Sequence, residues 1–227
     1  MNLPERVLFV GAHCDDIELF AGGLLARACF GGRRVGVLVF SDHRGVVDEE
    51  TAAAARREFA DNVAWLRRES GADVRDHSDR MLPACRGAFQ AERGALYAAM
   101  EILRSDYDVV VTHPPSDTNQ DHRQVAEEAA RVFKAHASVL GGEFPNNDIG
   151  GFTPQVYVAL TPREVDAKIR MVSRYRSQDF GGRPYLDGDT VRALARLRGS
   201  QIREMAAEAF TVVGRIVVRG ADVASAR

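Results

Sequence analysis

One histidine and three acidic residues follow the first apolar stretch of the chain. Residues 7–10, Val-Leu-Phe-Val, have the composition of a buried strand, and His13, Asp15, Asp16 and Glu18 come directly after them. Packing does not require this polarity, because a turn from a strand into a helix needs at most one capping Asp. Imidazole and carboxylate groups are good zinc ligands, and a bend after the strand can aim His13 and Asp16 at one ion. The segment therefore predicts a metal site; the alternative is a capped turn with solvated acids.

Asp15 would lie beside this ion without having to bind it. A carboxylate in that place can take a proton from a metal-bound water, because the metal lowers the pKa of the water. Asp15 is therefore a candidate for the proton acceptor in a hydrolytic reaction.

A second polar cluster follows a later strand-like stretch, residues 109–112. It includes His113, Asn119, Asp121 and His122. The carboxyl ends of parallel strands lie at one edge of an open sheet, so the two clusters can meet there. His122 would then be the third protein ligand, because two His, one Asp and one open position make a catalytic zinc site. Asn119 and Asp121 would orient neighbouring groups.

The spacing of apolar residues predicts alternating strands and helices. The expected strands are 7–10, 35–40, 72–76, 109–112, 155–160 and 210–218, and the expected helices are 19–30, 48–68, 90–104, 121–137, 162–175 and 189–207. Two stretches, 77–89 and 138–152, have irregular patterns, and the second is predicted to be a surface loop and a candidate lid. Both are expected to shape substrate specificity. We predict one α/β domain, residues 1–227, with a mostly parallel sheet.

Composition limits the class of protein. The chain has 227 residues, of which 45% are hydrophobic, and its net charge of −2 comes from interspersed acidic and basic residues. This pattern argues against a nucleic-acid-binding surface. No run of about 18 apolar residues predicts a membrane span, and the N-terminus does not resemble a signal peptide. Three cysteines without a C-x-x-C pair indicate reduced thiols and a cytoplasmic location.

Several segments resemble the LmbE-like, or PIG-L, deacetylases. The two metal motifs of that family, A-H-P-D-D-x-E and D-x-H-x-D-H-R, correspond here to A-H-C-D-D-I-E and D-T-N-Q-D-H-R. The likeness continues in order through G-G-F-T-P-Q-V-Y-V, R-Y-R-S-Q and R-G-S-Q-I-R-E-M-A-A-E-A-F. It implies a Rossmann-like fold with helices on both faces of the sheet, and a homo-oligomer. It also implies one Zn²⁺, or another divalent ion such as Fe²⁺, and hydrolysis of an N-acetyl group on an amino sugar or glycoconjugate.

The resemblance also implies roles for individual residues. His13, Asp16 and His122 correspond to the metal ligands. Asp15 corresponds to the general base that activates the metal-bound water and then protonates the leaving amine. Glu18 is expected to support the start of the first helix, with a role in substrate binding as the alternative.

Two residues depart from the family pattern. Cys14 stands where the family usually has Pro, and we expect a small buried thiol rather than a fourth ligand. Asn119 stands where the family usually has a His that helps to stabilise the oxyanion. An uncharged amide in its place costs roughly 2–3 kcal/mol of transition-state stabilisation. The enzyme is then slow, or His113 or His43 supplies the donor.

The substrate-binding Arg of the family is also displaced. It usually lies three residues before a Glu, but Ala55 has that spacing from Glu58, with Arg56 and Arg57 next to it. Either Arg, and His43 at the end of the second strand, are candidates for substrate contacts. Two rival functions stay open, namely an amidase for larger acyl groups and a metal-binding protein with weak or no catalysis. A nucleotide-binding module is disfavoured, because the glycine pairs match no phosphate-binding pattern.

Overall fold

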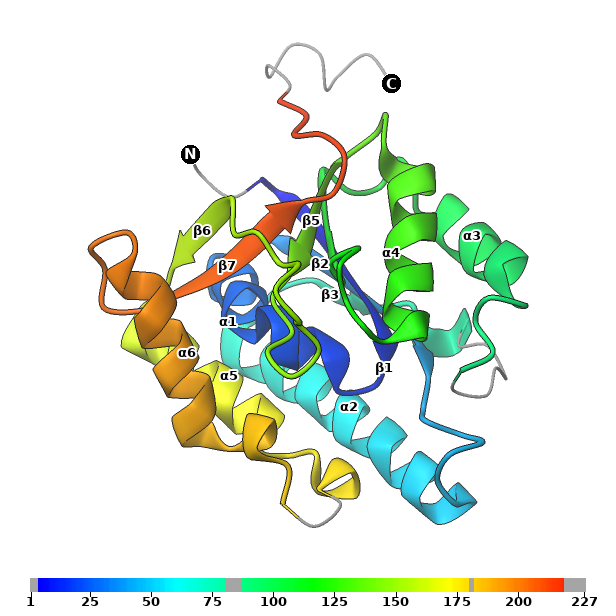
Figure 1. The fold of residues 1–227 in the computed structure, drawn as a ribbon, viewed down its shortest axis with the longest axis horizontal. Coiled ribbons are helices and arrows are strands. Elements are labelled where there is room, and N and C mark those ends of the chain that lie inside the picture. The colour runs from blue at the N-terminus through cyan, green and yellow to red at the C-terminus, as the bar shows by residue number, and fades with distance from the viewer. Residues whose placement is uncertain (1–3, 81–86, 180–181, 219–227) are drawn as a thin grey trace.

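A seven-stranded mixed sheet forms the centre of the computed structural model, which describes residues 4–80, 87–179 and 182–218 (Figure 1). The strand order is β3-β2-β1-β4-β5-β7-β6. The strands are β1 Arg6–His13, β2 Arg34–Ser41, β3 Val74–Asp76, β4 Val109–Thr112, β5 Ser138–Gly142, β6 Val156–Ala159 and β7 Ala207–Val212. The pairs among β3, β2, β1, β4 and β5 are parallel, whereas β7 is antiparallel to both β5 and β6. The predicted mostly parallel α/β sheet is confirmed.

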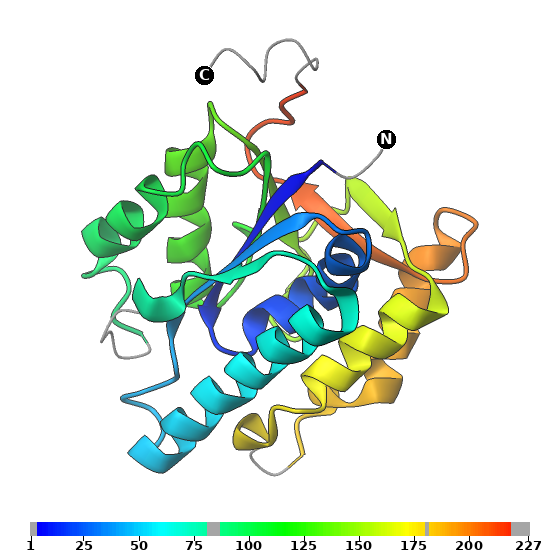
Figure 2. The ribbon, with the colours of Figure 1, turned by 180° about the vertical axis from the view of Figure 1, so that it is seen from behind.

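Helices cover both faces of this sheet. They are α1 Asp16–Phe30, α2 Glu49–Ser70, α3 Arg93–Glu101, α4 Gln120–Phe133, α5 Pro162–Val172 and α6 Gly188–Ser200, with 3-10 turns η1 Ser78–Arg80, η2 Arg176–Gln178 and η3 Pro184–Leu186. Helices α3 and α4 lie on one face, and α1, α2 and α5 lie on the other (Figures 1 and 2). Alternate residues of β1 supply the two cores: Phe9 packs with the α1 side and Leu8 with the α4 side.

Strand β5 corrects one prediction from the sequence. Residues 138–142 form a buried strand, so the expectation that 138–152 is a surface loop is wrong for its first third. The two glycines that suggested a loop are required by packing. A Cβ on Gly141 would lie 2.7 Å from Pro114 Cα, and one on Gly142 would lie 2.7 Å from Phe20 Cδ2. Glycine therefore lets β5 fit against its neighbours.

The last helix and strand also differ from their predicted bounds. Helix α6 ends at Ser200 and β7 begins at Ala207, whereas the sequence predicted a helix to residue 207 and a strand from 210. The chain turns sharply in between: Arg203 has a φ of 63°, and Glu204 N donates to Gly199 O at 3.0 Å. A Cβ on Gly199 would lie 2.6 Å from Ala206 N, so glycine is needed for this tight return.

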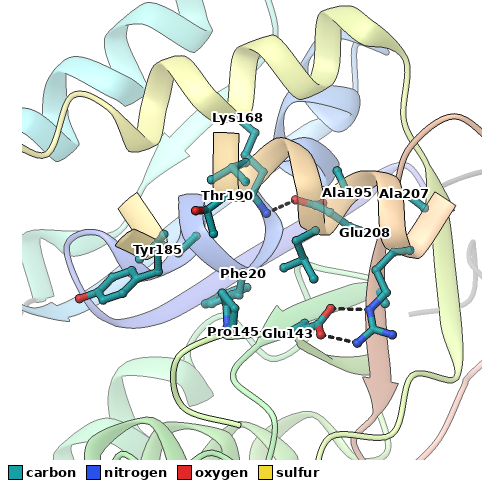
Figure 3. Close-up of a pocket in the computed structure, with 14 residues that line it drawn as sticks. Phe20, Glu143, Pro145, Lys168, Tyr185, Thr190, Ala195, Ala207 and Glu208 are labelled. Carbon is teal, nitrogen blue, oxygen red and sulfur yellow. Dashed lines mark hydrogen bonds and ion pairs between the residues drawn. The ribbon is translucent and has the colours of Figure 1, made fainter. Parts of the chain in front are cut away.

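Helix α1 is broken near its start, and a carboxylate from β7 supports the break. Ala21 has a non-helical φ of −147°. Glu208 accepts hydrogen bonds from Gly23 N at 2.8 Å and from Leu24 N at 2.7 Å, and it pairs with Lys168 Nζ at 2.7 Å (Figure 3). Glu208 thus satisfies backbone donors that the break leaves without helical partners, and a carboxylate there suits the helix dipole.

Candidate metal centre

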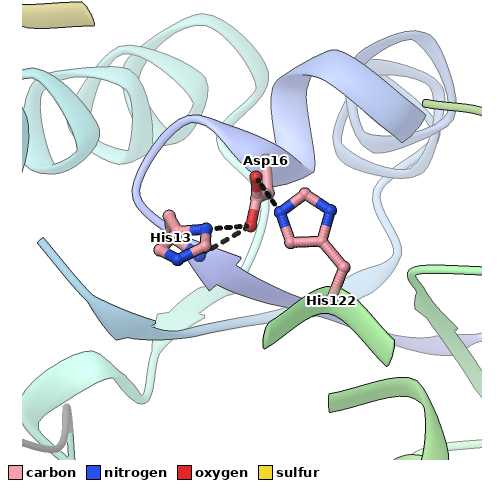
Figure 4. A group of neighbouring side chains, drawn as sticks. All are labelled: His13, Asp16 and His122. Carbon is pink, nitrogen blue, oxygen red and sulfur yellow. Dashed lines mark hydrogen bonds and ion pairs between the residues drawn. The ribbon is translucent and has the colours of Figure 1, made fainter. Parts of the chain in front are cut away.

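His13, Asp16 and His122 come together at the carboxyl edge of the sheet (Figure 4). They are the last residue of β1, the first residue of α1 and a residue in the first turn of α4. His13 Nδ1 lies 3.3 Å from Asp16 Oδ2, and His122 Nε2 lies 3.3 Å from Asp16 Oδ1. One ligand atom from each residue lies within 4.8 Å of the others. The three residues predicted as ligands therefore converge on one point.

A carboxylate holds the outer nitrogen of each of the two imidazoles. Asp117 Oδ2 lies 2.8 Å from His122 Nδ1, and Asp121 Oδ2 lies 3.2 Å from His13 Nε2. Such a carboxylate partner fixes the tautomer of an imidazole and leaves the lone pair of its other nitrogen for a metal. Carboxylate partners of this kind are typical of histidines that bind a metal.

The turn before α4 delivers both carboxylates. Asn119 N donates to Asp117 Oδ1 at 2.8 Å, and Asp121 N donates to Asn119 Oδ1 at 2.9 Å, so Asn119 is the N-cap of α4. Asp117 thus forms an Asx turn with Asn119. The contact of Asp117 with His122 was not predicted from the sequence. An acid five residues before a predicted ligand was the available signal.

Buried negative charge is concentrated around the triad. The four carboxylates are at most 4% exposed, and they belong to Asp15, Asp16, Asp117 and Asp121. Burying anions is costly without nearby positive charge. Burial lowers the pKa of His122, but Asp16 and Asp117 outweigh this effect and raise it to about 10. A site of this charge, with nitrogen and oxygen donors, fits a divalent cation.

Asp15 lies beside the triad with His43 against it. Asp15 Oδ1 is 3.2 Å from His43 Nε2, and the His43 ring stacks on His13 with centroids 4.9 Å apart. Burial raises the pKa of the Asp15 carboxyl, but the neighbouring His43 and His13 lower it more, so the pKa lies below its ordinary value. Asp15 is therefore an ionised carboxylate next to the ligand atoms.

His113 also reaches the site, as a buried ring stacked on His122 with centroids 3.8 Å apart. Ala12 N donates to His113 Nε2 at 3.0 Å. Burial and the neighbouring His122 lower the pKa of His113 to about 4. His113 is thus neutral near pH 7, and its Nε2 is an acceptor.

The residues predicted to bind substrate lie further out. Glu18 is buried between helices, where it accepts hydrogen bonds from Tyr175 Oη at 2.9 Å and Asn62 Nδ2 at 3.0 Å, and burial raises its pKa to about 8. Arg56 pairs with Asp42, and Arg57 is exposed on α2. Among the described residues, no hydrogen bond or ion pair joins Glu18, Arg56 or Arg57 to the triad.

Cys14 lies outside the triad. Cys14 is fully buried, burial raises its pKa well above the ordinary range, and it is not among the candidate metal ligands in the described part of the chain. Cys85 lies outside the described residues.

The cavity in Figure 3 does not include the triad. Phe20 lines this cavity and also packs edge-on against His113, with ring centroids 5.0 Å apart. Within the described ranges, no helix is both long and apolar enough to cross a bilayer.

A family model described as PIG-L, GlcNAc-PI de-N-acetylase, matches residues 8–133. The match covers more than half of the chain and contains both metal motifs. The chain belongs to the PIG-L family.

Individual proteins resemble this PIG-L protein over most or nearly all of its length. The uncharacterized deacetylase YaiS of Escherichia coli K12 is 27% identical over 184 residues, which cover 78% of this chain and 93% of YaiS. The structure of the conserved protein TT1542 from Thermus thermophilus has a TM-score of 0.72 at 23% identity and covers 96% of this chain and 98% of its own. The N,N'-diacetylchitobiose deacetylase from Pyrococcus horikoshii has a TM-score of 0.65 at 21% identity, with 92% and 83% covered. The two structures confirm the predicted fold.

Proposed function

We propose that this PIG-L protein is a metal-dependent N-deacetylase that hydrolyses the acetamide of an amino sugar or glycoconjugate. The observation that carries the proposal is the triad of His13, Asp16 and His122 with the ionised Asp15 beside it. The description of the family model, the name of YaiS and the chitobiose substrate of the P. horikoshii enzyme all support deacetylation.

The proposed ion is Zn²⁺, held by His13, Asp16 and His122, with Fe²⁺ as the alternative. When bound, such an ion polarises the acyl carbonyl and lowers the pKa of water. Asp15 takes a proton from the attacking water as the new C–O bond forms at the carbonyl carbon. Asp15 then gives this proton to the amine nitrogen as the C–N bond breaks, so that acetate and a free amine result.

The other polar residues have supporting roles in this proposal. Asp117 and Asp121 keep the two ligand imidazoles in place, and Asn119 begins the helix that carries His122. Arg56 and Arg57 stay candidates for contacts with a larger glycoconjugate at the edge of the site. For Glu18, the bonds to Tyr175 and Asn62 support a structural role in joining helices.

Four expectations from the sequence continue as proposals. They are a single domain, a cytoplasmic location, assembly into a homo-oligomer, and an N-acetylated amino sugar as the substrate, for which we propose N-acetylglucosamine. The family description supports the last of these.

The test is a screen of N-acetylated amino sugars, free and conjugated, for release of the amine by the zinc-loaded protein. We expect release that stops when a chelator removes the metal and returns when zinc is restored. Matched substrates with longer acyl groups test the larger-acyl amidase, because that enzyme releases the longer acid faster than acetate. A protein that binds one zinc ion and releases no amine from any of these substrates would contradict the proposal.

A further inference from the structure

Hydrolysis of an amide places negative charge on the former carbonyl oxygen, and enzymes provide a hydrogen-bond donor for it. Three side chains near the triad are candidates for this donor: Asn119, His113 and His43. The inference that follows rests on the proposed function.

The structure argues against the first two candidates. The side-chain oxygen of Asn119 accepts the backbone N–H of Asp121, so this amide is tied to the start of α4. His113 Nε2 accepts the backbone N–H of Ala12 at 3.0 Å. A ring nitrogen that accepts a hydrogen bond cannot donate one at the same time, so the Nε2 of His113, which lies 3.1 Å from Asp16 Oδ2, is not a donor. The proton of the neutral ring is then on Nδ1, which has no hydrogen-bond partner among the described residues and is not the nitrogen that faces Asp16.

His43 differs from both because neither of its ring nitrogens has a hydrogen-bond partner and its Nε2 makes only an ion-pair contact with Asp15. It is only 4% exposed, yet neither Nδ1 nor Nε2 has a hydrogen-bond partner among the described residues. The Nε2 atom lies 3.2 Å from Asp15 Oδ1, but without the alignment of a hydrogen bond. Buried polar atoms are normally hydrogen-bonded, so two ring nitrogens without a hydrogen bond indicate a ligand that supplies the partner.

The backbone of His43 is held so that the ring turns inward. Its φ of 67° lies in the left-handed region, which a non-glycine residue adopts rarely, and such residues concentrate at functional sites. Ser41 Oγ accepts the His43 N–H at 3.2 Å, and Val46 N donates to His43 O at 3.2 Å. The turn thus fixes the imidazole against Asp15 and over the His13 ring.

We propose that His43 is a catalytic residue that donates a hydrogen bond to the carbonyl oxygen of the scissile amide. When the water oxygen bonds to the carbonyl carbon, the π electron pair moves to the carbonyl oxygen, and the His43 N–H stabilises that charge. When the C–N bond breaks, the pair returns to re-form the carbonyl of acetic acid, and the proton held by Asp15 goes to the amine nitrogen. Acetic acid then loses its proton to water to give acetate. His43 keeps its own proton throughout.

The decisive variant is His43→Gly, because glycine tolerates the left-handed backbone while it removes the ring. Arg203→Gly is the matched control, since Arg203 has a similar φ of 63° in the turn between α6 and β7. We expect His43→Gly to lower kcat by about 10²–10³-fold, with KM and zinc affinity changed less than about threefold. We expect added imidazole to restore part of the activity of His43→Gly and not to raise that of Arg203→Gly.

A second readout does not depend on turnover. Acetohydroxamate presents an acetyl group and an oxygen acceptor, and we expect His43→Gly to weaken its binding to the zinc-loaded protein by about tenfold or more. If kcat and acetohydroxamate affinity both match those of Arg203→Gly, His43 is not the donor. If the wild-type protein releases no acetate from any substrate, the proposed function fails. The effect of His43→Gly on acetohydroxamate affinity then still shows whether His43 donates a hydrogen bond to a bound acetyl oxygen.

Discussion

Asp117 contacts His122 through one carboxylate oxygen and the backbone of its own turn through the other. The Oδ2 atom lies 2.8 Å from His122 Nδ1, and Oδ1 accepts the backbone N–H of Asn119 at 2.8 Å. One buried side chain therefore sets both the start of α4 and the orientation of a candidate ligand. The local fold of this turn and the geometry of the metal centre cannot vary independently.

Asp117→Asn should weaken the metal site more than the fold. Asn can form the same Asx turn, but its neutral amide is a poorer partner for the His122 ring. We expect zinc affinity to fall about 10–100-fold in competition with a chromophoric chelator, because partners of ligand histidines typically contribute that much. Asp187→Asn is the control, because Asp187 also accepts the backbone N–H two residues further on, at the start of α6. Unchanged zinc affinity in Asp117→Asn would show that the contact does not orient the ligand.

Asp15→Asn should separate metal binding from turnover. Asp15 lies next to the triad but is not in the group of atoms that converge within 4.8 Å, so the substitution should leave one zinc ion per chain. We expect kcat for amine release to fall by about 10²–10⁴-fold, the usual contribution of a general base. Zinc content by elemental analysis and kcat should be measured on the same preparation. Near-normal turnover in a zinc-loaded Asp15→Asn protein would mean that another group is the base.

The convergence of the candidate metal ligands was largely predictable because these residues occupy fixed places relative to the strands. His13 ends β1 and His122 opens α4, and parallel pairing of β1 with β4 is enough to bring these two points together. The roles of Asp117 and His43 were not predictable in the same way. Each depends on where one oxygen or nitrogen atom points, and sequence spacing does not give that direction.

The fold could be predicted from the sequence wherever the spacing of apolar residues was regular. The prediction failed where contacts with other elements determine which residue type fits. Gly141 and Gly142 resemble loop residues in the sequence, but they are glycine because Pro114 and Phe20 leave no room for a Cβ. Only the assembled sheet reveals that constraint. The early end of α6 could not be predicted for the same reason. Gly199 is a glycine because a Cβ there would meet the backbone of Ala206.

Gly142→Ala should destabilise the protein through overpacking. Its Cβ would lie 2.7 Å from Phe20 Cδ2 and 2.8 Å from Phe20 O, and the backbone oxygen cannot move aside easily. We expect a loss of about 1–3 kcal/mol in the free energy of unfolding, measured by urea denaturation. Gly94→Ala in α3 is the matched control. An added Cβ there meets no heavy atom within 4 Å, and we expect a gain of about 0.5–1 kcal/mol. Equal effects of the two substitutions would contradict the packing explanation for β5.

The ion pairs of Asp42 predict a pH-dependent contribution to stability. Burial raises the pKa of this carboxyl, but hydrogen bonds from Arg44 and Arg56 outweigh it and hold the pKa well below its usual range. A depressed folded-state pKa stabilises the protein at pH values above the unfolded-state value of about 3.9, and the contribution is lost as the pH falls toward the folded value.

We therefore expect Asp42→Asn to be less stable than the wild type by about 1.5–3 kcal/mol at pH 7, the usual effect of hydrogen bonds to a charged group. The difference should shrink steadily below about pH 4, where the unfolded chain takes up a proton at Asp42 and the folded chain does not. Urea denaturation of both proteins at pH 7, 5, 4 and 3 measures this. Asp166→Asn is the control, because Asp166 is 63% exposed in its pair with Arg192 and such surface pairs contribute only about 0–1 kcal/mol. A difference between wild type and Asp42→Asn that stays constant from pH 7 to 3 would show that packing, and not the charge of Asp42, is what the substitution removes.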